Sequence, residues 1–328
     1  MLVLSEHETA TLLDLDDLRR AVAAVMADVS AGRASMPPRI AAHVDDRDAI
    51  LAAMPAYLPS VRGLAAKLVS LFPHNAGGDR PTHQAVVVVF DAETGEPTAM
   101  LDGTSITTAR TAAGSALATE LLARPDAHVL AILGTGVQAR SHAQAVTRVR
   151  PFDQIRIAGR TRASVDQLVD ELRPVLAAEV VAADDIAAAC AGADVVCAAT
   201  HSPDPVIVRE DIRPGMHLTS VGYNVAGREV DSRTVADSLL VVESRSAVLA
   251  PPPAGANEIR VPISEGLITE DHIHAELGEI VSGTRPGRDS AEQITLYKSV
   301  GIAAEDVAAA ELVLRAARAA GVGTEIAM

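Results

Sequence analysis

The sequence predicts an α/β protein in which a doubly wound Rossmann domain is joined to an α+β domain. Two observations lead to this fold class. The chain has 328 residues, more than the roughly 100–200 of a usual single domain, so we expect two domains. From about residue 119, strand and helix patterns alternate, which is typical of a parallel sheet. We therefore place the α+β domain at residues 1–118 and 303–328, and the Rossmann domain at 119–302.

The α+β domain has a mixed pattern of apolar runs and turns. Two apolar runs, residues 85–90 and 97–101, flank the turn-forming residues 91–95 and predict a β-hairpin. Helical spacing of apolar residues predicts helices over residues 16–31, 107–122 and 303–320, the last ending at Gly321. We expect this last helix to return to the α+β domain.

Short apolar runs in the second domain are typical of buried parallel strands. The expected strands are residues 129–133, 154–158, 180–182, 195–198, 217–221 and 239–242. Helical patterns lie between most of these strands, and one of them covers residues 141–149, directly after the first strand.

The first expected strand ends in a glycine turn, V-L-A-I-L-G-T-G-V-Q-A over residues 129–139. In such a turn Gly134 permits the tight bend, Gly136 lets the backbone approach a pyrophosphate, and Ala139 lets the next helix pack closely. Because the helix N-terminus then faces the anion, the turn predicts a dinucleotide site. A plain strand-turn-helix is the alternative interpretation. The predicted phosphate-binding residues are Gly134, Thr135, Gly136, Val137 and Gln138.

The end of the second strand indicates which dinucleotide binds. NAD sites place an acidic residue there for the ribose hydroxyls, but this chain reads Gly159-Arg160-Thr161-Arg162. Two guanidinium groups and a hydroxyl suit a 2′-phosphate through charge-assisted hydrogen bonds. We therefore expect Arg160, Thr161 and Arg162 to bind NADP(H), with NAD(H) also possible. The alternative is a pair of solvated arginines on a loop.

Charge and composition exclude several classes of partner. With a formal net charge of -15, the chain lacks the basic surface that nucleic acid or an anionic membrane requires. Neither a signal peptide nor a long apolar span is present, so we expect a soluble protein of the cytoplasm. Cys190 and Cys197 are too few for a disulfide framework or a thiolate metal site, which fits a reducing compartment.

A zinc site is the main alternative from another chemistry, because His272, His274 and Glu276 lie close together in the sequence. Their spacing argues against it, since residues two apart on a helix point in different directions. Residues 269–271 are more typical of a helix start with acidic residues in its first turn. We predict no metal. Hydrolase and kinase motifs are also missing from the sequence.

Several segments together resemble the ornithine cyclodeaminase/mu-crystallin family, and they span nearly the whole chain. They are Met54-Pro55-Ala56-Tyr57, Lys67-Leu68-Val69, His83-Gln84-Ala85, Asp102-Gly103-Thr104-Ser105-Ile106-Thr107, Arg110-Thr111-Ala112-Ala113, the glycine turn, Ala275-Glu276-Leu277-Gly278-Glu279 and Lys298-Ser299-Val300-Gly301. The resemblance implies a Rossmann domain, an N-terminal substrate-binding and dimerisation domain completed by the C-terminal helix, and a homodimer. The family includes ornithine cyclodeaminases, amino-acid dehydrogenases, ketimine reductases and thyroid-hormone-binding mu-crystallins.

The resemblance also implies a set of site residues. Arg39, Lys67 and Arg110 match the cations that hold the carboxylate of an amino or imino acid over the nicotinamide. Converging cations would offset the repulsion that an anion meets from an acidic protein. Taken singly, each would more often be a surface charge, and His83 could equally be an ordinary loop histidine. The expected cofactor contacts outside the turn and the second strand are Thr82, His83, Arg110, Thr111, Thr200, Val221, Arg228, Ser299 and Gly301.

One departure from the family pattern narrows the expected activity. Where the cyclodeaminases carry an Asp that acts on amine groups, this chain has Asn224, and an amide cannot serve as a base. Reduction of a preformed cyclic imine needs only a positioned hydride, an anchored carboxylate and a proton from solvent or the iminium. Asn224 could still orient the ring nitrogen, although it could also be a simple turn residue.

We therefore predict an NAD(P)H-dependent ketimine reductase that converts 1-pyrroline-2-carboxylate or 1-piperideine-2-carboxylate into L-proline or L-pipecolate. The predicted catalytic residues are Lys67, Arg110 and Asn224, and Arg39 joins them in binding the substrate. Two alternatives stay open. One is an amino-acid dehydrogenase or ornithine cyclodeaminase, and the other is a noncatalytic NADP-dependent binding protein of the mu-crystallin kind.

Overall fold

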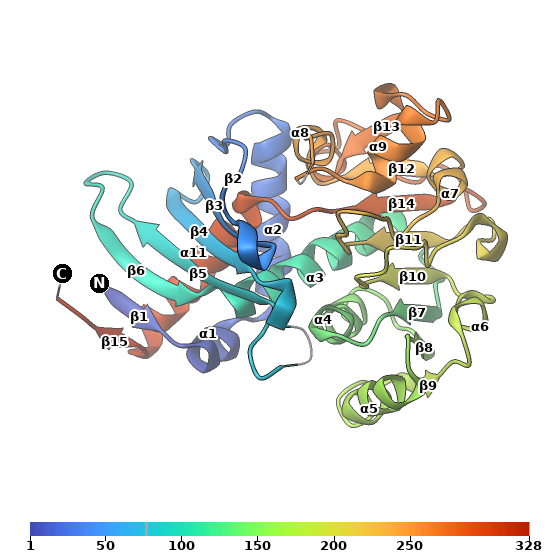
Figure 1. Ribbon diagram of the computed structural model, residues 1–328, viewed down its shortest axis with the longest axis horizontal. Coiled ribbons are helices and arrows are strands. Elements are labelled where there is room, and N and C mark those ends of the chain that lie inside the picture. Colours follow the sequence, from blue (N-terminus) through green and yellow to red (C-terminus); the bar gives the residue numbers. More distant parts are fainter. Residues whose placement is uncertain (76–77, 253, 328) are drawn as a thin grey trace. The chain divides into compact units, whose positions relative to one another are not determined.

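A computed structural model describes residues 1–75, 78–252 and 254–327 (Figure 1). The chain divides into two compact units. Unit 1 consists of Met1–Arg110 and Ile302–Met328, and unit 2 of Thr111–Gly301. The boundary lies at Arg110 rather than at residue 118 as predicted. It falls inside helix α3 (Gly103–Leu122), and an uninterrupted helix carries no sequence signal that would mark it.

Unit 1 is built on one mixed sheet with the order β15-β1-β6-β5-β4-β3-β2. Its elements are β1 (Leu2–Leu4), α1 (Glu6–Leu12), α2 (Leu15–Ser30), β2 (Ile40–Val44), β3 (Ala49–Leu58), β4 (Gly63–Leu71), β5 (His83–Phe90), β6 (Pro97–Asp102), the start of α3, α11 (Ala303–Ala320) and β15 (Thr324–Glu325). The predicted hairpin is confirmed as the antiparallel pair β5 and β6. Strands β1 to β4 and β15 were not predicted from the sequence.

The predicted helices of unit 1 are confirmed with shifted ends. Helix α2 begins and ends one residue before the predicted range, and α3 begins at Gly103 rather than at residue 107. Helix α11 covers the predicted range, and Gly321 caps it in the left-handed conformation that favours glycine. It packs on β3, β4 and β5 of the sheet. At Gly63 a Cβ atom would lie 2.6 Å from Val307 Cγ1, so glycine is needed for this close packing.

Unit 2 holds a parallel sheet with the order β13-β12-β14-β11-β10-β7-β8-β9 (Figure 1). Its elements after α3 are β7 (Val129–Leu133), α4 (Val137–Val146), β8 (Gln154–Ala158), α5 (Arg162–Leu172), β9 (Glu179–Ala182), α6 (Ile186–Cys190), β10 (Val195–Ala198), β11 (His217–Ser220), α7 (Ser232–Ala236), β12 (Leu239–Val242), α8 (Arg245–Val248), α9 (Asn257–Ser264), β13 (Ile273–Glu276), α10 (Leu277–Val281) and β14 (Thr295–Lys298). The α/β fold class with a Rossmann-like parallel sheet is therefore confirmed.

Every strand predicted for unit 2 is present, although β9 begins one residue earlier and β11 ends one residue earlier than expected. Helix α4 covers 137–146 instead of 141–149. Strands β13 and β14 were missed. The sequence of β14, T-L-Y-K, is fully buried, yet its polar residues hide the apolar run that marks a buried strand. The expected helix start at 269–271 is present as a single 3₁₀ turn, Glu270–His272, which has Thr269 at its N-cap without a side-chain hydrogen bond and leads directly into β13.

The strand order locates the ligand crevice of unit 2. The chain passes from β7 outward to β8 and β9 and then returns to β10 on the other side of β7. Ligands of open parallel sheets bind outside the carboxyl ends of the strands where the order reverses in this way. The carboxyl ends of β7 and β10 therefore define the expected dinucleotide position.

Candidate active site

The glycine turn lies at this reversal, and its two glycines have different structural roles. Gly134 has a φ of +117°, and a Cβ atom there would lie 2.5 Å from the Ala199 carbonyl oxygen at the end of β10. At Gly136 a Cβ atom would meet no protein atom within 4 Å. Gly136 caps α4 without a side-chain hydrogen bond, so the first amide groups of α4 remain available to an anion. Ala139 is fully buried, as close packing of α4 requires.

Thr135, between the two glycines, packs against the end of the second strand. A Cβ atom at Gly159 would lie 2.6 Å from Thr135 Cγ2, so this contact depends on glycine. Val137 is exposed and Gln138 is partly buried at the start of α4. The five predicted phosphate-binding residues thus form the turn after β7 and the first residues of α4, and at Gly136 the protein leaves open space beside the backbone.

The two arginines after β8 differ in their surroundings. Arg162 is exposed, but its Nε lies 2.8 Å from Asp166 Oδ1 and its Nη1 lies 3.7 Å from Asp184 Oδ1. Arg160 is also exposed, and within residues 1–75, 78–252 and 254–327 it makes no ion pair. Thr161 caps α5 and accepts a hydrogen bond from the Ser164 amide. Of the three predicted 2′-phosphate ligands, Arg160 is thus the cation that no carboxylate neutralises.

A buried carboxylate, Glu229, joins the ends of β10 and β11 and was not predicted. Its Oε1 accepts hydrogen bonds from the Thr200 amide at 2.6 Å and the Thr200 hydroxyl at 2.7 Å. Its Oε2 accepts them from the Ser220 hydroxyl at 2.8 Å and the Gly222 amide at 2.7 Å. Thr200, predicted to contact the cofactor, therefore supports the local backbone through Glu229.

Lys298, at the end of β14, completes this network. Its Nζ donates to the Gly222 carbonyl at 2.7 Å and the Ser220 hydroxyl at 3.1 Å, and it lies 3.2 Å from Glu258 Oε1. The Glu229 amide donates to the same Glu258 oxygen at 2.9 Å. The segment 220–229, which carries the predicted residues Val221, Asn224 and Arg228, is therefore held at both ends by buried charged groups.

Asn224 uses its side chain within its own turn. Its Nδ2 donates to the His201 carbonyl at 3.2 Å, and its Oδ1 accepts from the Ala226 amide at 2.9 Å. The Asn257 side chain donates to the Asn224 carbonyl at 3.1 Å. Asn224 thus has the structural role that the turn interpretation describes. Its action on a substrate stays a prediction.

The remaining cofactor candidates are spread over both units. Ser299 is buried and donates its hydroxyl to Glu243 Oε2 at 2.9 Å, and Gly301 has a φ of +77°. Arg228 Nη2 lies 3.7 Å from Glu265 Oε1, in unit 2. Thr82 and His83 form a side-chain hydrogen bond at the start of β5 in unit 1. Thr111 is buried in α3 within unit 2.

Unit 1 brings together two of the three predicted carboxylate ligands, Lys67 on β4 and Arg110 on α3. Both are buried, and a carboxylate that was not predicted, Asp306 on α11, lies between them. Lys67 Nζ lies 2.7 Å from Asp306 Oδ2, and Arg110 Nε donates to Asp306 Oδ1 at 3.1 Å. Arg110 Nη1 also donates to Glu305 Oε2 at 2.8 Å. We refer to these four residues, Lys67, Arg110, Glu305 and Asp306, as the buried charge cluster.

The cluster alters the acidity of Lys67. Burial, together with the charges of Arg110 and Arg39, lowers the pKa of Lys67 to about 8, although Asp306 acts in the opposite direction. The ammonium form therefore predominates at pH 7. Arg39, the third predicted carboxylate ligand, is exposed and near enough to act on Lys67 electrostatically. The charges of the other two predicted carboxylate ligands, Arg110 and Arg39, thus both act on Lys67.

Glu305 and Asp306 gave no recognisable signal in the sequence. Acidic residues in the first turn of a helix usually complement its dipole at the surface, and these two occupy that position in α11. Only their burial against Lys67 and Arg110 distinguishes them.

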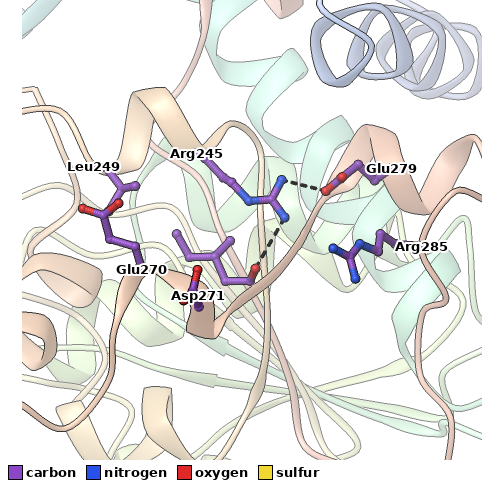
Figure 2. A pocket seen from close by; sticks show the side chains of 7 residues that line it. Arg245, Leu249, Glu270, Asp271, Glu279 and Arg285 are labelled. Carbon is purple, nitrogen blue, oxygen red and sulfur yellow. Dashed lines mark hydrogen bonds and ion pairs between the residues drawn. The ribbon is translucent and has the colours of Figure 1, made fainter.

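A hollow in unit 2 is lined by none of the predicted site residues (Figure 2). It has a volume of about 340 Å³, and charged side chains dominate its lining. Arg245 Nη1 donates to Glu279 Oε2 at 2.7 Å inside it. The lining residues are Arg245, Leu249, Glu270, Asp271, Ile273, Glu279 and Arg285.

The candidate zinc ligands do not converge. His272 lies in the 3₁₀ turn and bonds the Val235 carbonyl, whereas His274 lies in β13 and bonds the Pro286 carbonyl. Among the residues that the structure describes, no group of three or more His, Cys, Asp and Glu side chains is placed to hold a metal ion. In the same described ranges, no helix combines the length and apolar character needed to cross a bilayer.

Comparison with known proteins agrees with this architecture. The sequence model of the ornithine cyclodeaminase/mu-crystallin family matches residues 1–321. The chain is 32% identical over 328 residues to a Delta(1)-pyrroline-2-carboxylate reductase of Bacillus cereus, covering 99% of each chain. It is 35% identical over 283 residues to the ketimine reductase mu-crystallin of Mus musculus, covering 86% of this chain and 85% of that one.

A solved structure extends the similarity to three dimensions. It shows Thermococcus litoralis Delta(1)-pyrroline-2-carboxylate reductase in complex with NADH and L-proline, with a TM-score of 0.95 and 36% sequence identity. The match covers 99% of this chain and 100% of that chain. Fold and glycine turn thus define an α/β protein of the dinucleotide-binding class. Within that class, the chain belongs to the ornithine cyclodeaminase/mu-crystallin family.

Proposed function

We propose that this protein is an NAD(P)H-dependent reductase of cyclic ketimines, which converts 1-pyrroline-2-carboxylate or 1-piperideine-2-carboxylate into L-proline or L-pipecolate. The observation that carries the proposal is the buried pair of cations, Lys67 and Arg110. Asp306 holds the two cations together at one buried site, and an ammonium beside a guanidinium suits the carboxylate that a ketimine acid supplies. The full-length similarity to pyrroline-2-carboxylate reductases supports the same substrate class.

In this reaction, separate sets of residues bind the substrate and the dinucleotide. Lys67 and Arg110, with Arg39, bind the substrate carboxylate and orient the C=N bond. The turn from Gly134 to Gln138 binds the pyrophosphate of the dinucleotide, whose reduced nicotinamide supplies the hydride when bound. The ring nitrogen takes its proton from solvent or enters already protonated, so no carboxylate base is required. In this scheme Asn224 orients the ring nitrogen by hydrogen bonding.

A substrate panel tests the proposal. Oxidation of NADPH and NADH is followed with 1-pyrroline-2-carboxylate, 1-piperideine-2-carboxylate, pyruvate with ammonia, and, in the oxidative direction, ornithine and alanine. We expect turnover with at least one cyclic ketimine. Turnover of ornithine or alanine without any ketimine turnover would reject the proposal. Tight NADPH binding with no turnover at all would favour the noncatalytic binding protein.

We further propose that NADP(H) is preferred over NAD(H), and the exposed cation Arg160, which makes no ion pair with the described residues, supports this preference. Replacing Arg160 with Ala should weaken NADPH binding about 10- to 100-fold and NADH binding less than about threefold, because only NADPH carries the 2′-phosphate. Arg162→Ala is the matched comparison. Its loss should be smaller, since Asp166 and Asp184 already engage that guanidinium. Calorimetric titration with both dinucleotides measures the effect, and equal losses for both would contradict the preference.

A homodimer formed through the sheet of unit 1 is also part of the proposal. Ile40, Leu51, Leu68 and Val86 are large apolar residues with exposed fractions of 71%, 48%, 37% and 37%. In the sheet register Leu68 pairs with Val86 and with Ala53, which in turn pairs with Ile40, so these residues share one face. An apolar face of this kind is typical of a protein interface. Sedimentation should give twice the 34.0 kDa of one chain, and a monomer at micromolar concentration would contradict the proposal.

A further inference from the structure

Lysine is rare in this chain and occurs at buried positions. The sequence contains 26 arginines but only two lysines, Lys67 and Lys298. Both are buried, with exposed fractions of 3% and 1%, and each contacts a carboxylate. Surface cations can be Lys or Arg with little consequence, and here they are all Arg. The two positions that retain Lys therefore require a compact ammonium group that a planar guanidinium cannot replace.

At Lys67 the carboxylate partner has an unusual bridging position. Asp306 presents Oδ2 to Lys67 Nζ at 2.7 Å and Oδ1 to Arg110 Nε at 3.1 Å. One side chain of α11 thereby connects a cation on β4 with a cation on α3. Two buried like charges repel each other strongly, and an anion between them removes that repulsion and sets their separation.

Three charged side chains act on Lys67, namely Asp306, Arg110 and Arg39. Arg110 and Arg39 both disfavour the ammonium form of Lys67, and Asp306 favours it. The remaining close polar group is the Thr107 hydroxyl, 3.4 Å from Lys67 Nζ, and it carries no charge. Glu305 contacts Arg110 instead, with a distance of 2.8 Å. Asp306 is therefore a carboxylate in direct contact with Lys67, whereas Glu305 contacts Arg110 and the Ile302 amide at the start of α11.

We propose that Asp306 is a positioning residue of the ketimine site, which holds Lys67 and Arg110 at one spacing and keeps Lys67 cationic for the substrate carboxylate. This inference rests on the proposed function, because it assigns the substrate carboxylate to these two cations. A purely structural ion pair would stabilise the fold without affecting how the site responds to pH. A carboxylate that merely competes with the substrate would weaken substrate binding.

The two lysines make a direct titration possible. In protein labelled with ¹³C at lysine Cε, two signals are expected, and Lys67→Met assigns them. Asp306→Asn should lower the pKa of Lys67 by about 1–3, the effect of removing an opposite charge at contact distance. Glu305→Gln is the matched control and should leave the Lys67 titration where it is in the wild type. Lys298 serves as the internal reference in every variant.

Kinetics then link this titration to the reaction. In the wild type kcat/KM for ketimine reduction should fall above about pH 8, as Lys67 loses its proton. The fall should begin at a lower pH in Asp306→Asn and at the wild-type pH in Glu305→Gln. Titration of the substrate itself is common to all variants and cancels in the comparison. If Asp306→Asn fails to fold, Asp306→Glu keeps the charge and should retain the pH profile while lowering kcat/KM about tenfold, because the longer side chain changes the spacing.

Four results would overturn the inference: an unchanged Lys67 titration in Asp306→Asn, a shifted titration with an unchanged kinetic profile, tighter ketimine binding by Asp306→Asn, or full activity of Asp306→Glu. Failure of the proposed function looks different. If the wild type reduces no ketimine, the role of Asp306 in that reaction is also removed, yet the lysine signals still show whether Asp306 controls Lys67.

Discussion

Replacing Lys67 with Met is expected to lower kcat/KM for a cyclic ketimine by about 10²–10³-fold, the usual effect of removing one charged donor from an enclosed site. Met has a similar length and fills the buried space, so the loss reflects the missing ammonium. NADPH affinity should change less than about twofold, because Lys67 is not among the predicted cofactor contacts. Steady-state kinetics and a dinucleotide titration on the same preparation measure both effects.

The control for Lys67→Met is a cation of unit 1 outside the buried charge cluster. Arg47 is exposed and pairs only loosely with Asp46, at 3.7 Å, so Arg47→Ala should leave kcat/KM unchanged. Thermal unfolding separates a functional loss from a folding defect. Removing Lys67 leaves Asp306 bonded to Arg110 Nε, so a folded variant is expected. Wild-type activity in folded Lys67→Met would show that the cluster does not bind the substrate.

The two glycines of the turn should respond to the same substitution in opposite ways. Gly134→Ala puts a Cβ atom 2.5 Å from the Ala199 carbonyl oxygen at a φ of +117°, so we expect the free energy of unfolding to fall by about 2–4 kcal/mol. Gly136→Ala meets no protein atom within 4 Å and should leave stability within about 0.5 kcal/mol. It should instead weaken dinucleotide binding at least tenfold, because the added methyl occupies the approach path of the pyrophosphate.

Chemical denaturation and dinucleotide titration of the two variants decide this prediction. Gly95 offers a control for backbone strain alone, since it has a φ of +75° and no atom within 4 Å of its Cβ position. Gly95→Ala should destabilise less than Gly134→Ala and leave dinucleotide binding unchanged. A stable Gly136→Ala protein that binds NADPH with wild-type affinity would place the pyrophosphate elsewhere.

The parts of the fold that were predicted correctly are those in which local pattern and tertiary environment agree. Strands such as β7 and β10 are buried on both faces and are therefore continuous apolar runs. Strand β14 lies in the middle of the same sheet but contains Thr295 and Lys298, whose polar groups find partners on segments far away in the sequence, such as His217 and Gly222. The sequence alone has no way to show that those partners exist.

The same reason explains what was missed in the site. The glycine turn is a continuous segment whose function depends on backbone conformation, and its residues were all recognised. Glu229, Glu305 and Asp306 were not, since an acidic residue gives the same sequence signal whether it is solvated or buried against a cation. Asn224 was recognised, but its hydrogen bonds within the turn became visible only in three dimensions.

By itself, the sequence determined the fold class, the glycine turn and the family, because these depend on residue types at short and regular spacing. Only the tertiary structure decided that Lys67 and Arg110 share the carboxylate of Asp306, and that Glu229 and Lys298 hold the segment with Asn224. The physical reason is burial. The strength of an ionic contact depends on its distance and on exclusion of water, and folding sets both by joining residues far apart in the chain.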